Sequence, residues 1–406
     1  MDLTVDPRPA MLPKRARWEL SQSRLDIEQR SRTSRLPWRG QFSPNLVEYL
    51  MQAVCPDSRM FLDPFCGSGT VLFEALGREA SAVGAEVNPA AWHLASVVGF
   101  SELPKTEQRT AIATSRRALR FALRHRDDAQ VLDELVRSIG SVESEMARII
   151  LAAALILGMG NGHIATKDVL ERSLNMIEST LRELAGNERP GAHCLLADAR
   201  RLGLRDDTID GVITSPPYIN VFNYHQNHRP AIERLGWKPL DAARSEIGAN
   251  RKHRQNRFLT VLQYSLDMAA VLNELIRVMK SCAPLVIVLG RTSSVLGASF
   301  ANGKMIERLL SVSGFGRTEK AERMFVNRYG DRIFEDILIA ERRNGLLIRD
   351  EDAREVGLQS LSNARNMVSE KNRELLEQAI DAWREVSPSP QLAISAPSPF
   401  VEAVAR

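Results

Sequence analysis

The chain has 406 residues, with 54 basic and 50 acidic side chains and a formal net charge of +4. Hydrophobic residues make up 44% and charged residues 26%, which is the composition of an ordinary globular protein with a sizeable core. The near balance of charge excludes bulk charge as a source of nucleic-acid binding, which would need a local basic patch.

The four cysteines, Cys55, Cys66, Cys194 and Cys282, are too far apart to supply a zinc-ligand pair, and no His-rich spacing accompanies them. We therefore expect no metal, and the cysteine usage suits a reducing cytoplasm. Met1–Pro13 has no apolar core of the kind found in signal peptides. The longest apolar run, Ile149–Leu157, is too short to span a bilayer. A cytoplasmic protein without a membrane segment is expected.

In chain order, residues 1–36 are polar and Arg-rich and predict a mobile basic arm. A short strand at Arg59–Asp63 leads through a Gly-rich turn to a helix at Val71–Leu76, and a second strand covers Ala80–Ala85. From about 100 to 190 the apolar residues recur at helical spacing, which indicates a helical insertion between the second and third strands.

Strands return after this insertion, and a long amphipathic helix, Leu259–Met279, lies among them. These later strands are expected at His193–Leu196, Ile209–Thr214, Pro284–Leu289 and near Phe334–Ala340. Strands that alternate with helices predict an α/β fold with a doubly wound, parallel sheet.

Beyond Arg343 the chain predicts one further helix, from about Asn363 to Val386. Ser387–Pro399 holds four Pro and four Ser among thirteen residues, so we expect this tail to be disordered. The resulting division is an arm at 1–36, a main domain at 37–342, and a C-terminal helix with a disordered tail at 343–406.

The Gly-rich turn after the first strand predicts a cofactor site. Its sequence is Asp63-Pro64-Phe65-Cys66-Gly67-Ser68-Gly69-Thr70. Two glycines one residue apart let the backbone approach a ligand closely, and the amides of the helix that follows favour a carboxylate or phosphate.

Two acidic residues end neighbouring strands. Glu86 stands 17 residues past Gly69 and is followed by Val87, Asn88 and Pro89. A carboxylate in this position holds ribose hydroxyls in nucleotide-binding sheets. Asp198 ends the next strand and could accept a hydrogen bond from an adenine amine, or could cap a following helix.

The fourth strand leads into Ser215-Pro216-Pro217-Tyr218. The amine of a nucleobase is a poor nucleophile, because its lone pair is delocalised into the ring, and it needs two acceptors for its protons. The Ser215 hydroxyl and the Pro216 carbonyl could provide them, while the rigid Pro217 holds the turn and Tyr218 stacks on an extruded base.

With these motifs the chain resembles the amino-methyltransferases of DNA, which methylate cytosine N4 or adenine N6. The cofactor motif of that family resembles Asp63–Thr70, and its catalytic motif resembles Ser215–Tyr218. The stretch Trp38–Tyr49 is similar to the family segment that packs against the methionine part of the cofactor. The resemblance covers roughly residues 37–342.

The resemblance implies a doubly wound, mostly parallel, seven-stranded Rossmann-like methyltransferase sheet and S-adenosyl-L-methionine as cofactor. The residues implied to bind the cofactor are Phe42, Ser43, Pro44, Asp63, Phe65, Gly67, Ser68, Gly69, Thr70, Glu86, Asn88 and Asp198. The residues implied in catalysis are Ser215, Pro216, Pro217 and Tyr218.

In that family, Ser at the first catalytic position usually accompanies cytosine N4, so site-specific methylation of cytosine N4 in DNA is the favoured function. Adenine N6 in DNA, a base amine in RNA, and a non-catalytic subunit of a defence complex remain alternatives. Cytosine C5 methylation needs a Cys nucleophile after Pro, and none of the four cysteines follows a proline. The recognition sequence, the oligomeric state and any restriction-modification partner are not readable.

The segment 221–260 is a candidate DNA contact. It carries eight Lys or Arg and three Asp or Glu, a net charge of +5 (8 − 3). Basic residues with aromatic neighbours suit phosphate contacts, although the same segment could be a solvated face. The candidate DNA-binding residues are His228, Arg229, Arg251, Lys252, Arg254 and Arg257.

Overall fold

Seven strands form one sheet, in the order β3-β2-β1-β4-β5-β9-β8. They are β1 (Met60–Asp63), β2 (Ser81–Glu86), β3 (Ala192–Leu196), β4 (Gly211–Thr214), β5 (Pro284–Gly290), β8 (Glu319–Val326) and β9 (Arg332–Glu341). The first five pair in parallel, while β9 runs antiparallel to both β5 and β8. A separate hairpin joins β6 (Thr292–Val295) to β7 (Ala298–Ala301). The doubly wound, mostly parallel, seven-stranded Rossmann-like sheet expected from the sequence is confirmed.

This computed structural model describes residues 17–27, 34–38, 40–160, 165–185, 190–219, 226–249, 253–327, 330–392, 397 and 400. The sheet is covered on both faces, because its strands are apolar on both sides. Phe61 and Ile213 point into one core, and their neighbours Leu62 and Val212 point into the other. On the first face lie α2 (Pro44–Val54), α3 (Thr70–Gly77) and α4 (Pro89–Ser96), and on the second lie α11 (Leu259–Val278), α12 (Asn302–Ser311) and α13 (Asp350–Asn363).

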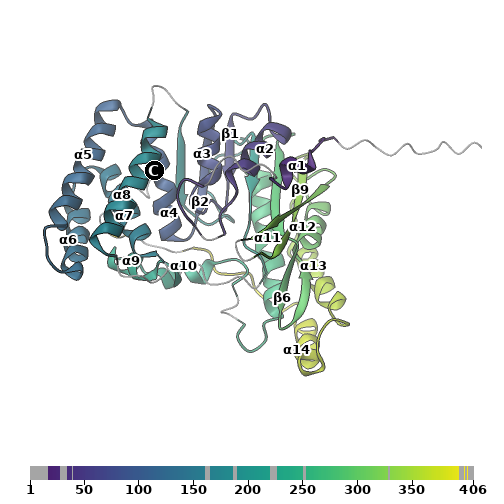
Figure 1. Cartoon of the computed structure of the whole chain (residues 1–406). Coiled ribbons are helices and arrows are strands. Elements are labelled where there is room, and N and C mark those ends of the chain that lie inside the picture. The colour runs from purple at the N-terminus through teal and green to yellow at the C-terminus, as the bar shows by residue number, and fades with distance from the viewer. Residues whose placement is uncertain are drawn as a thin grey trace, which may run out of the picture.

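The helical insertion lies between β2 and β3, as expected, and forms the left half of Figure 1. It contains η1 (Val97–Glu102), α5 (Lys105–Ala122), α6 (Asp128–Ser141), α7 (Glu145–Gly158) and α8 (Lys167–Leu184). The apolar run Ile149–Leu157 forms most of α7, which is buried nearly all round and occupies the centre of the insertion. Even so, no helix in the described part of the chain is both long and apolar enough to cross a membrane.

Part of the N-terminal arm is packed, which corrects the expectation of a mobile arm for residues 17–27. Gln22–Leu25 form α1, and Leu25 is buried. Asp26 accepts a hydrogen bond from the backbone of Met324 at 2.7 Å, and Gln22 donates one to the carbonyl of Glu322 at 2.9 Å. These side chains cover backbone groups of the edge strand β8 that have no partner strand. Residues 1–16 and 28–33 lie outside the described residues.

The C-terminal region also differs from the expectation of one helix and a disordered tail. Two helices form, α13 and α14 (Glu370–Asp381), and α13 ends where the predicted helix should begin. Gly357 lets α13 approach α11, since a Cβ there would lie 3.1 Å from Leu262 Cα. The described tail residues Ser387–Leu392 make buried hydrogen bonds instead of being disordered, because a buried arginine and two carboxylates bind their backbone.

Cys66 of the Gly-rich turn and Leu72 of α3 pack so closely on β2 that position 84 has no room for a side chain, which predicts an effect of substitution on stability. A Cβ at Gly84 would lie 2.4 Å from Cys66 Sγ and 3.2 Å from Leu72 Cδ1. We expect Gly84→Ala to destabilise the protein by about 1–3 kcal/mol through overpacking, measured as a lower midpoint in urea. Gly77→Ala is the matched control, because nothing lies within 4 Å of its Cβ, and it should leave the midpoint unchanged or raise it. Equal midpoints for the two variants would contradict the packing argument.

Candidate functional site

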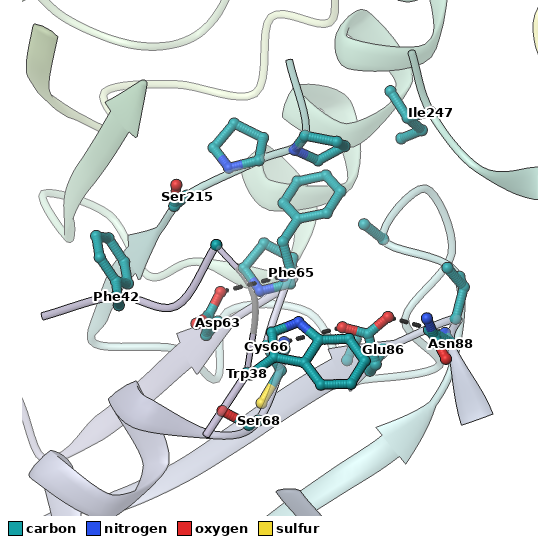
Figure 2. Close-up of a pocket in the computed structure, with 18 of the residues that line it drawn as sticks. Trp38, Phe42, Asp63, Phe65, Cys66, Ser68, Glu86, Asn88, Ser215 and Ile247 are labelled. Carbon is teal, nitrogen blue, oxygen red and sulfur yellow. Dashed lines mark hydrogen bonds between the residues drawn. The ribbon is translucent and has the colours of Figure 1, made fainter. Parts of the chain in front are cut away.

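A pocket opens at the carboxyl ends of the parallel strands, where the strand order reverses between β1 and β4. Open α/β sheets bind their ligands at this switch point. In Figure 2, Ser215 and Phe42 lie to the left of the pocket and Glu86 and Asn88 to the right, with Phe65 between them. The lining combines residues of the predicted motifs from four strand ends. These are Asp63–Ser68, Thr70, Glu86, Asn88, Asp198 and Ser215–Tyr218, whereas Gly69 is not among the lining residues.

The Gly-rich turn has the backbone shape that its glycines permit. Gly67 and Gly69 have φ angles of +53° and +91°, which L side chains rarely adopt. A Cβ at Gly69 would also lie 3.3 Å from the backbone of Ala95. Ser68 is buried beneath this turn, and its hydroxyl oxygen accepts a hydrogen bond from the Gln41 side-chain amide at 3.0 Å. The turn is therefore fixed from two sides before any ligand is considered.

Glu86 ends β2 with both carboxylate oxygens held. Oε2 accepts a hydrogen bond from the Gly67 amide and Oε1 one from the Asn88 amide, both at 2.8 Å. Asn88 in turn caps α4 by accepting from the Ala90 amide at 3.0 Å. Burial raises the pKa of Glu86 to about 7, although these hydrogen bonds oppose the shift. The predicted acid thus lies beside the predicted turn and lines the same pocket.

Asp63, at the end of β1, connects the Gly-rich turn to β4, the strand that precedes the Ser-Pro-Pro-Tyr loop. Its Oδ1 accepts hydrogen bonds from the Thr214 hydroxyl at 2.7 Å and the Phe65 amide at 3.1 Å. Burial raises the pKa of Asp63 to about 7 against the effect of both bonds. No Lys or Arg of the described residues forms an ion pair with Asp63 or Glu86, and no cation lowers the pKa of either carboxyl group.

The segment before α2 contributes to the pocket, although partly through residues that the motif did not predict. Phe42 lines the pocket, whereas Ser43 and Pro44 begin α2 and are not among the lining residues. Trp38 and Gln41 line it instead. A Cβ at Gly67 would lie 3.6 Å from the Trp38 ring, so the indole covers the glycine turn.

The Ser-Pro-Pro-Tyr loop follows β4 directly, and its carbonyl and hydroxyl groups differ in whether they have hydrogen-bond partners. The buried Tyr264 hydroxyl donates a hydrogen bond to the Pro217 carbonyl at 3.0 Å. The Ser215 hydroxyl and the Pro216 carbonyl have no hydrogen-bond partner among the described residues, and both residues line the pocket. The ring of Tyr218 packs on Gly290, where a Cβ would lie 2.8 Å from Cε2. Two residues with acceptor oxygens thus line the pocket beside an aromatic ring that is packed on the backbone.

Asp198 lines the pocket, but its carboxylate is occupied by protein donors. Oδ1 accepts from Arg200 N and Nε at 3.0 and 2.9 Å, and Oδ2 accepts from Arg200 Nη2 and Leu392 N at 2.6 and 3.1 Å. No helix follows it, so it is not a helix cap either. With two bonds on each oxygen, the side chain is a structural acceptor in the wall.

A further wall of the pocket comes from Ser245, Glu246 and Ile247, after α10 (Pro239–Ser245). These residues belong to the basic segment but contribute little charge. No periodic pattern or motif in the sequence marks them, apart from their position after the Ser-Pro-Pro-Tyr loop. Gly248, at φ +75°, lets the chain pass this loop, since a Cβ there would lie 2.5 Å from the Tyr218 carbonyl oxygen.

The basic segment divides into paired and unpaired cations. The His228 ring stacks on Trp38 with centroids 5.0 Å apart, and burial lowers the pKa of its imidazole, which therefore supplies no cation at neutral pH. In α9 (Arg229–Arg234), Arg229 pairs with Glu233 at 2.6 Å. Arg254 and Arg257 are exposed and form no ion pair with other described residues. Arg251, Lys252 and residues 221–225 lie outside the described residues.

In sequence comparisons, no family model and no curated protein matches the chain. Among solved structures, a SAM-dependent methyltransferase from Methanosarcina mazei is similar at 14% identity and a TM-score of 0.32, over 71% of this chain and 93% of that one. The rRNA methyltransferase AviRa from Streptomyces viridochromogenes is similar at 12% identity and 0.33, over 82% and 96%. A structure described as "Conversion of a Disulfide Bond into a Thioacetal Group during Echinomycin Biosynthesis" is similar at 12% and 0.31, over 79% and 91%.

The raised pKa of Asp63 predicts how the stability of the protein changes with pH. Asp63 has a pKa of about 7 in the folded chain and 3.8 as its reference value, so the folded state holds its proton more tightly. Its stabilising contribution is complete below about pH 4 and is lost as the pH rises through about 7. Asp63→Asn retains the acceptor oxygen for Thr214 and Phe65 without the charge. The Tm of this variant relative to wild type should therefore increase from pH 5 to pH 8.

Asp210→Asn is the control with the opposite sign. The Asp210 carboxylate pairs with Lys280 and accepts two backbone hydrogen bonds, and the pKa of this group is lowered although desolvation opposes the shift. Its stabilising contribution is present above the reference pKa and is lost in acid, so Asp210→Asn should lower the Tm at pH 8. A Tm difference for Asp63→Asn that does not change with pH would contradict the assignment of a buried, uncompensated charge.

Proposed function

We propose that the chain is a methyltransferase that transfers a methyl group from S-adenosyl-L-methionine to an exocyclic amine of a DNA base, with cytosine N4 favoured. The observation that carries the proposal is a single pocket that joins the Gly67–Gly69 turn and Glu86 to the Ser215–Tyr218 loop. A nucleoside-binding corner and an amine-accepting corner in one cavity are what transfer between a nucleoside cofactor and a nucleobase requires.

The residues of the pocket fit this cofactor by charge and shape. S-adenosyl-L-methionine is cationic at its sulfonium and ammonium groups, and it would meet the uncompensated carboxyl groups of Asp63 and Glu86. Glu86 would hold the ribose hydroxyls, and the apolar side chains of Phe65 and Ile247 would enclose the nucleoside. When bound, the cofactor supplies a methyl group that is already activated by the positive sulfur, so the chain needs no covalent nucleophile.

The catalytic loop would bind and orient the target amine. The Ser215 hydroxyl oxygen and the Pro216 carbonyl oxygen would accept hydrogen bonds from its two N–H groups, which directs the nitrogen lone pair away from the ring toward the methyl donor. Tyr264 already binds the Pro217 carbonyl, which leaves the neighbouring Pro216 carbonyl as the acceptor in this proposal. The Tyr218 ring, packed on Gly290, gives the extruded base a surface to stack on.

No strong general base is required in this scheme. After methyl transfer the amine nitrogen carries a surplus proton of low pKa, which it releases readily. No Asp, Glu or His occurs between Thr214 and Asn223, in agreement with this chemistry. The choice of cytosine N4 over adenine N6 rests on Ser215 through the family resemblance. If the substrate is DNA, a restriction-modification or defence system is the kind of partner that we propose.

The catalytic role of the Tyr218 ring is tested by two variants of the same residue. Tyr218→Ala should lower kcat by about one to two decades, because base stacking is worth roughly 1–3 kcal/mol, and should leave the Kd for S-adenosyl-L-methionine nearly unchanged. Tyr218→Phe keeps the ring and should have a mild effect.

Nucleoside analysis of methylated DNA should find N4-methylcytosine. If N6-methyladenine is found instead, the target base is adenine and the choice of cytosine N4 is wrong. If only RNA is methylated, the substrate is RNA and not DNA. Full activity of Tyr218→Ala would refute the stacking role.

Two variants of equal charge identify the surface that contacts DNA phosphates. One replaces Arg251, Lys252, Arg254 and Arg257 by Gln, in the basic segment beside the catalytic loop. The other replaces Arg109, Arg117, Arg120 and Arg124, which are exposed on and just after α5 and form no ion pair with other described residues.

We expect the first variant to weaken duplex binding and to make the slope of log K against log salt shallower, by about one unit for each phosphate that the protein no longer neutralises. The second variant should keep the slope of the wild type, measured by fluorescence anisotropy at several salt concentrations. The reverse result would place the phosphate contacts on the helical insertion and would overturn the assignment of the basic segment.

A further inference from the structure

Arg200 lies buried behind the pocket wall, between two carboxylates. Its side chain is 2% exposed. Nε and Nη2 donate to the two oxygens of Asp198 at 2.9 and 2.6 Å, and Nη1 donates to Asp267 Oδ1, on α11, at 2.7 Å. This forked geometry uses the planar guanidinium in a way that a lysine could not reproduce.

The C-terminal tail completes this ion cluster. Arg200 Nη1 donates to the Ser389 carbonyl at 2.7 Å, and Nη2 donates to the Pro390 carbonyl at 2.9 Å. In the opposite sense, the Ser389 amide donates to Asp267 at 2.8 Å and the Leu392 amide donates to Asp198 at 3.1 Å. Ser389, Pro390 and Leu392 of the tail thus give two acceptors to Arg200 and two donors to the acidic side chains.

The balance of charge explains why the tail is needed there. One guanidinium faces two carboxyl groups, and Asp267 is fully buried, so burial raises the pKa of its carboxyl although Arg200 and Ser389 oppose the shift. A buried carboxylate is stabilised by each hydrogen bond that it accepts, and Oδ2 of Asp267 has no partner among the described residues. The amides of Ser389 and Leu392 therefore supply donors to the two acidic side chains that the single arginine does not satisfy.

Arg200 also connects two walls of the pocket. Asp198 and Ala199 line it from the end of β3, and Ser245 and Ile247 line it from the end of α10. Arg200 bonds the first wall through Asp198 and the second through the Ser245 carbonyl, to which Nη2 donates at 3.2 Å. The cluster therefore fixes the spacing of two segments that are 47 residues apart (245 − 198).

A second contact holds the tail at Phe400. This residue is buried, and its ring centroid lies 4.5 Å from His93 of α4 and 6.0 Å from Trp237. The Trp237 indole donates to His93 Nε2 at 3.0 Å. The helix that precedes the tail, α14, and the helix that Phe400 contacts, α4, lie in opposite halves of Figure 1.

We propose that residues Ser389–Leu392 and Arg200 form a clamp that sets the two pocket walls for the nucleoside of the cofactor, so that cofactor binding depends on the C-terminal tail. Arg200 is a positioning residue, which acts through Asp198 and Ser245 and does not touch the ligand. The identity of that ligand as S-adenosyl-L-methionine rests on the proposed function, whereas the clamp rests on the contacts above.

Two truncations of the chain separate the clamp from the rest of the tail. Ending the chain after Pro388 removes all four tail contacts of the cluster, but keeps the Gln263 bond to the Ser387 carbonyl. Ending it after Leu392 keeps the four contacts and removes Phe400. By calorimetry, the first truncation should weaken S-adenosyl-L-methionine binding by about tenfold or more, as expected for coupled sites, and the second should bind as the full chain does. A synthetic peptide of residues 387–400 should restore binding to the first.

Full-length Arg200→Lys gives a readout that a general loss of stability would not. It should raise the KM for the cofactor and leave kcat at saturating cofactor close to wild type, with a cooperative thermal transition retained. Equal binding by the full chain and by the chain ending after Pro388, or equal weakening in both truncations, would overturn the clamp.

Hydrogen exchange distinguishes a wrong clamp from a wrong cofactor. If the full chain binds no S-adenosyl-L-methionine, the proposed function fails, and the clamp is judged without ligand. The backbone amides of residues 198–202 and 245–249 should then exchange faster after truncation at Pro388 than after truncation at Leu392. Unchanged exchange in both segments would overturn the clamp whatever the ligand is.

Discussion

The site depends on one buried hydrogen bond, from the Thr214 hydroxyl to the Asp63 carboxylate at 2.7 Å. It joins the ends of β1 and β4, the two strands between which the sheet reverses its order, across 151 residues of sequence. The backbone pairing of these strands stops at Leu62 and Val212, so the side chains continue it to the point where both loops begin. The glycine turn and the Ser-Pro-Pro-Tyr loop are therefore placed relative to each other by the residues at the ends of their own strands.

Sequence alone predicts the sheet and the motif loops, because both depend on local chemistry. Val212 and Ile213 are apolar neighbours that face opposite cores, which makes a central strand recognisable without knowledge of its partners. Gly67 and Gly69 are needed for their own backbone angles, and Glu86 binds a residue only 19 positions away. The edge strand β8 and the helix α13 are not predicted, since β8 is exposed on alternate residues and rich in charge, and α13 depends on the close approach at Gly357.

The pocket walls are less predictable, because the residues involved acquire their roles through distant contacts. In sequence, Arg200 is one of two adjacent arginines in a charged loop, and only its contacts 67 and 189 residues away identify it as buried. The sequence favours a ligand-binding role for Asp198 for the same reason, since nothing local shows that Arg200 and Leu392 occupy its oxygens. The Pro- and Ser-rich composition of the tail indicates weak intrinsic structure, and it does not report that an ion cluster elsewhere binds the tail backbone. Trp38 illustrates the remaining case, in which the predicted segment is correct but the side chain over Gly67 lies a few residues earlier.

The helical insertion lies in the connection between β2 and β3, two strands that are direct neighbours in the sheet. Because these strands are parallel, the connection runs from Glu86, at the end of β2, to Ala192, which starts β3 and lies beside Ala82, so the sheet holds its two ends at a fixed separation of one strand length. The entropy lost on closing a flexible loop grows only with the logarithm of its length, so that doubling the length costs about 0.6 kcal/mol. Because α7 gives the insertion an apolar centre of its own, this entropy cost places almost no limit on how many helices the loop can carry. The position between β2 and β3 is consequently one where the outer surface of the protein can be remodelled through evolution while the spacing of Gly67, Glu86 and Ser215 is preserved.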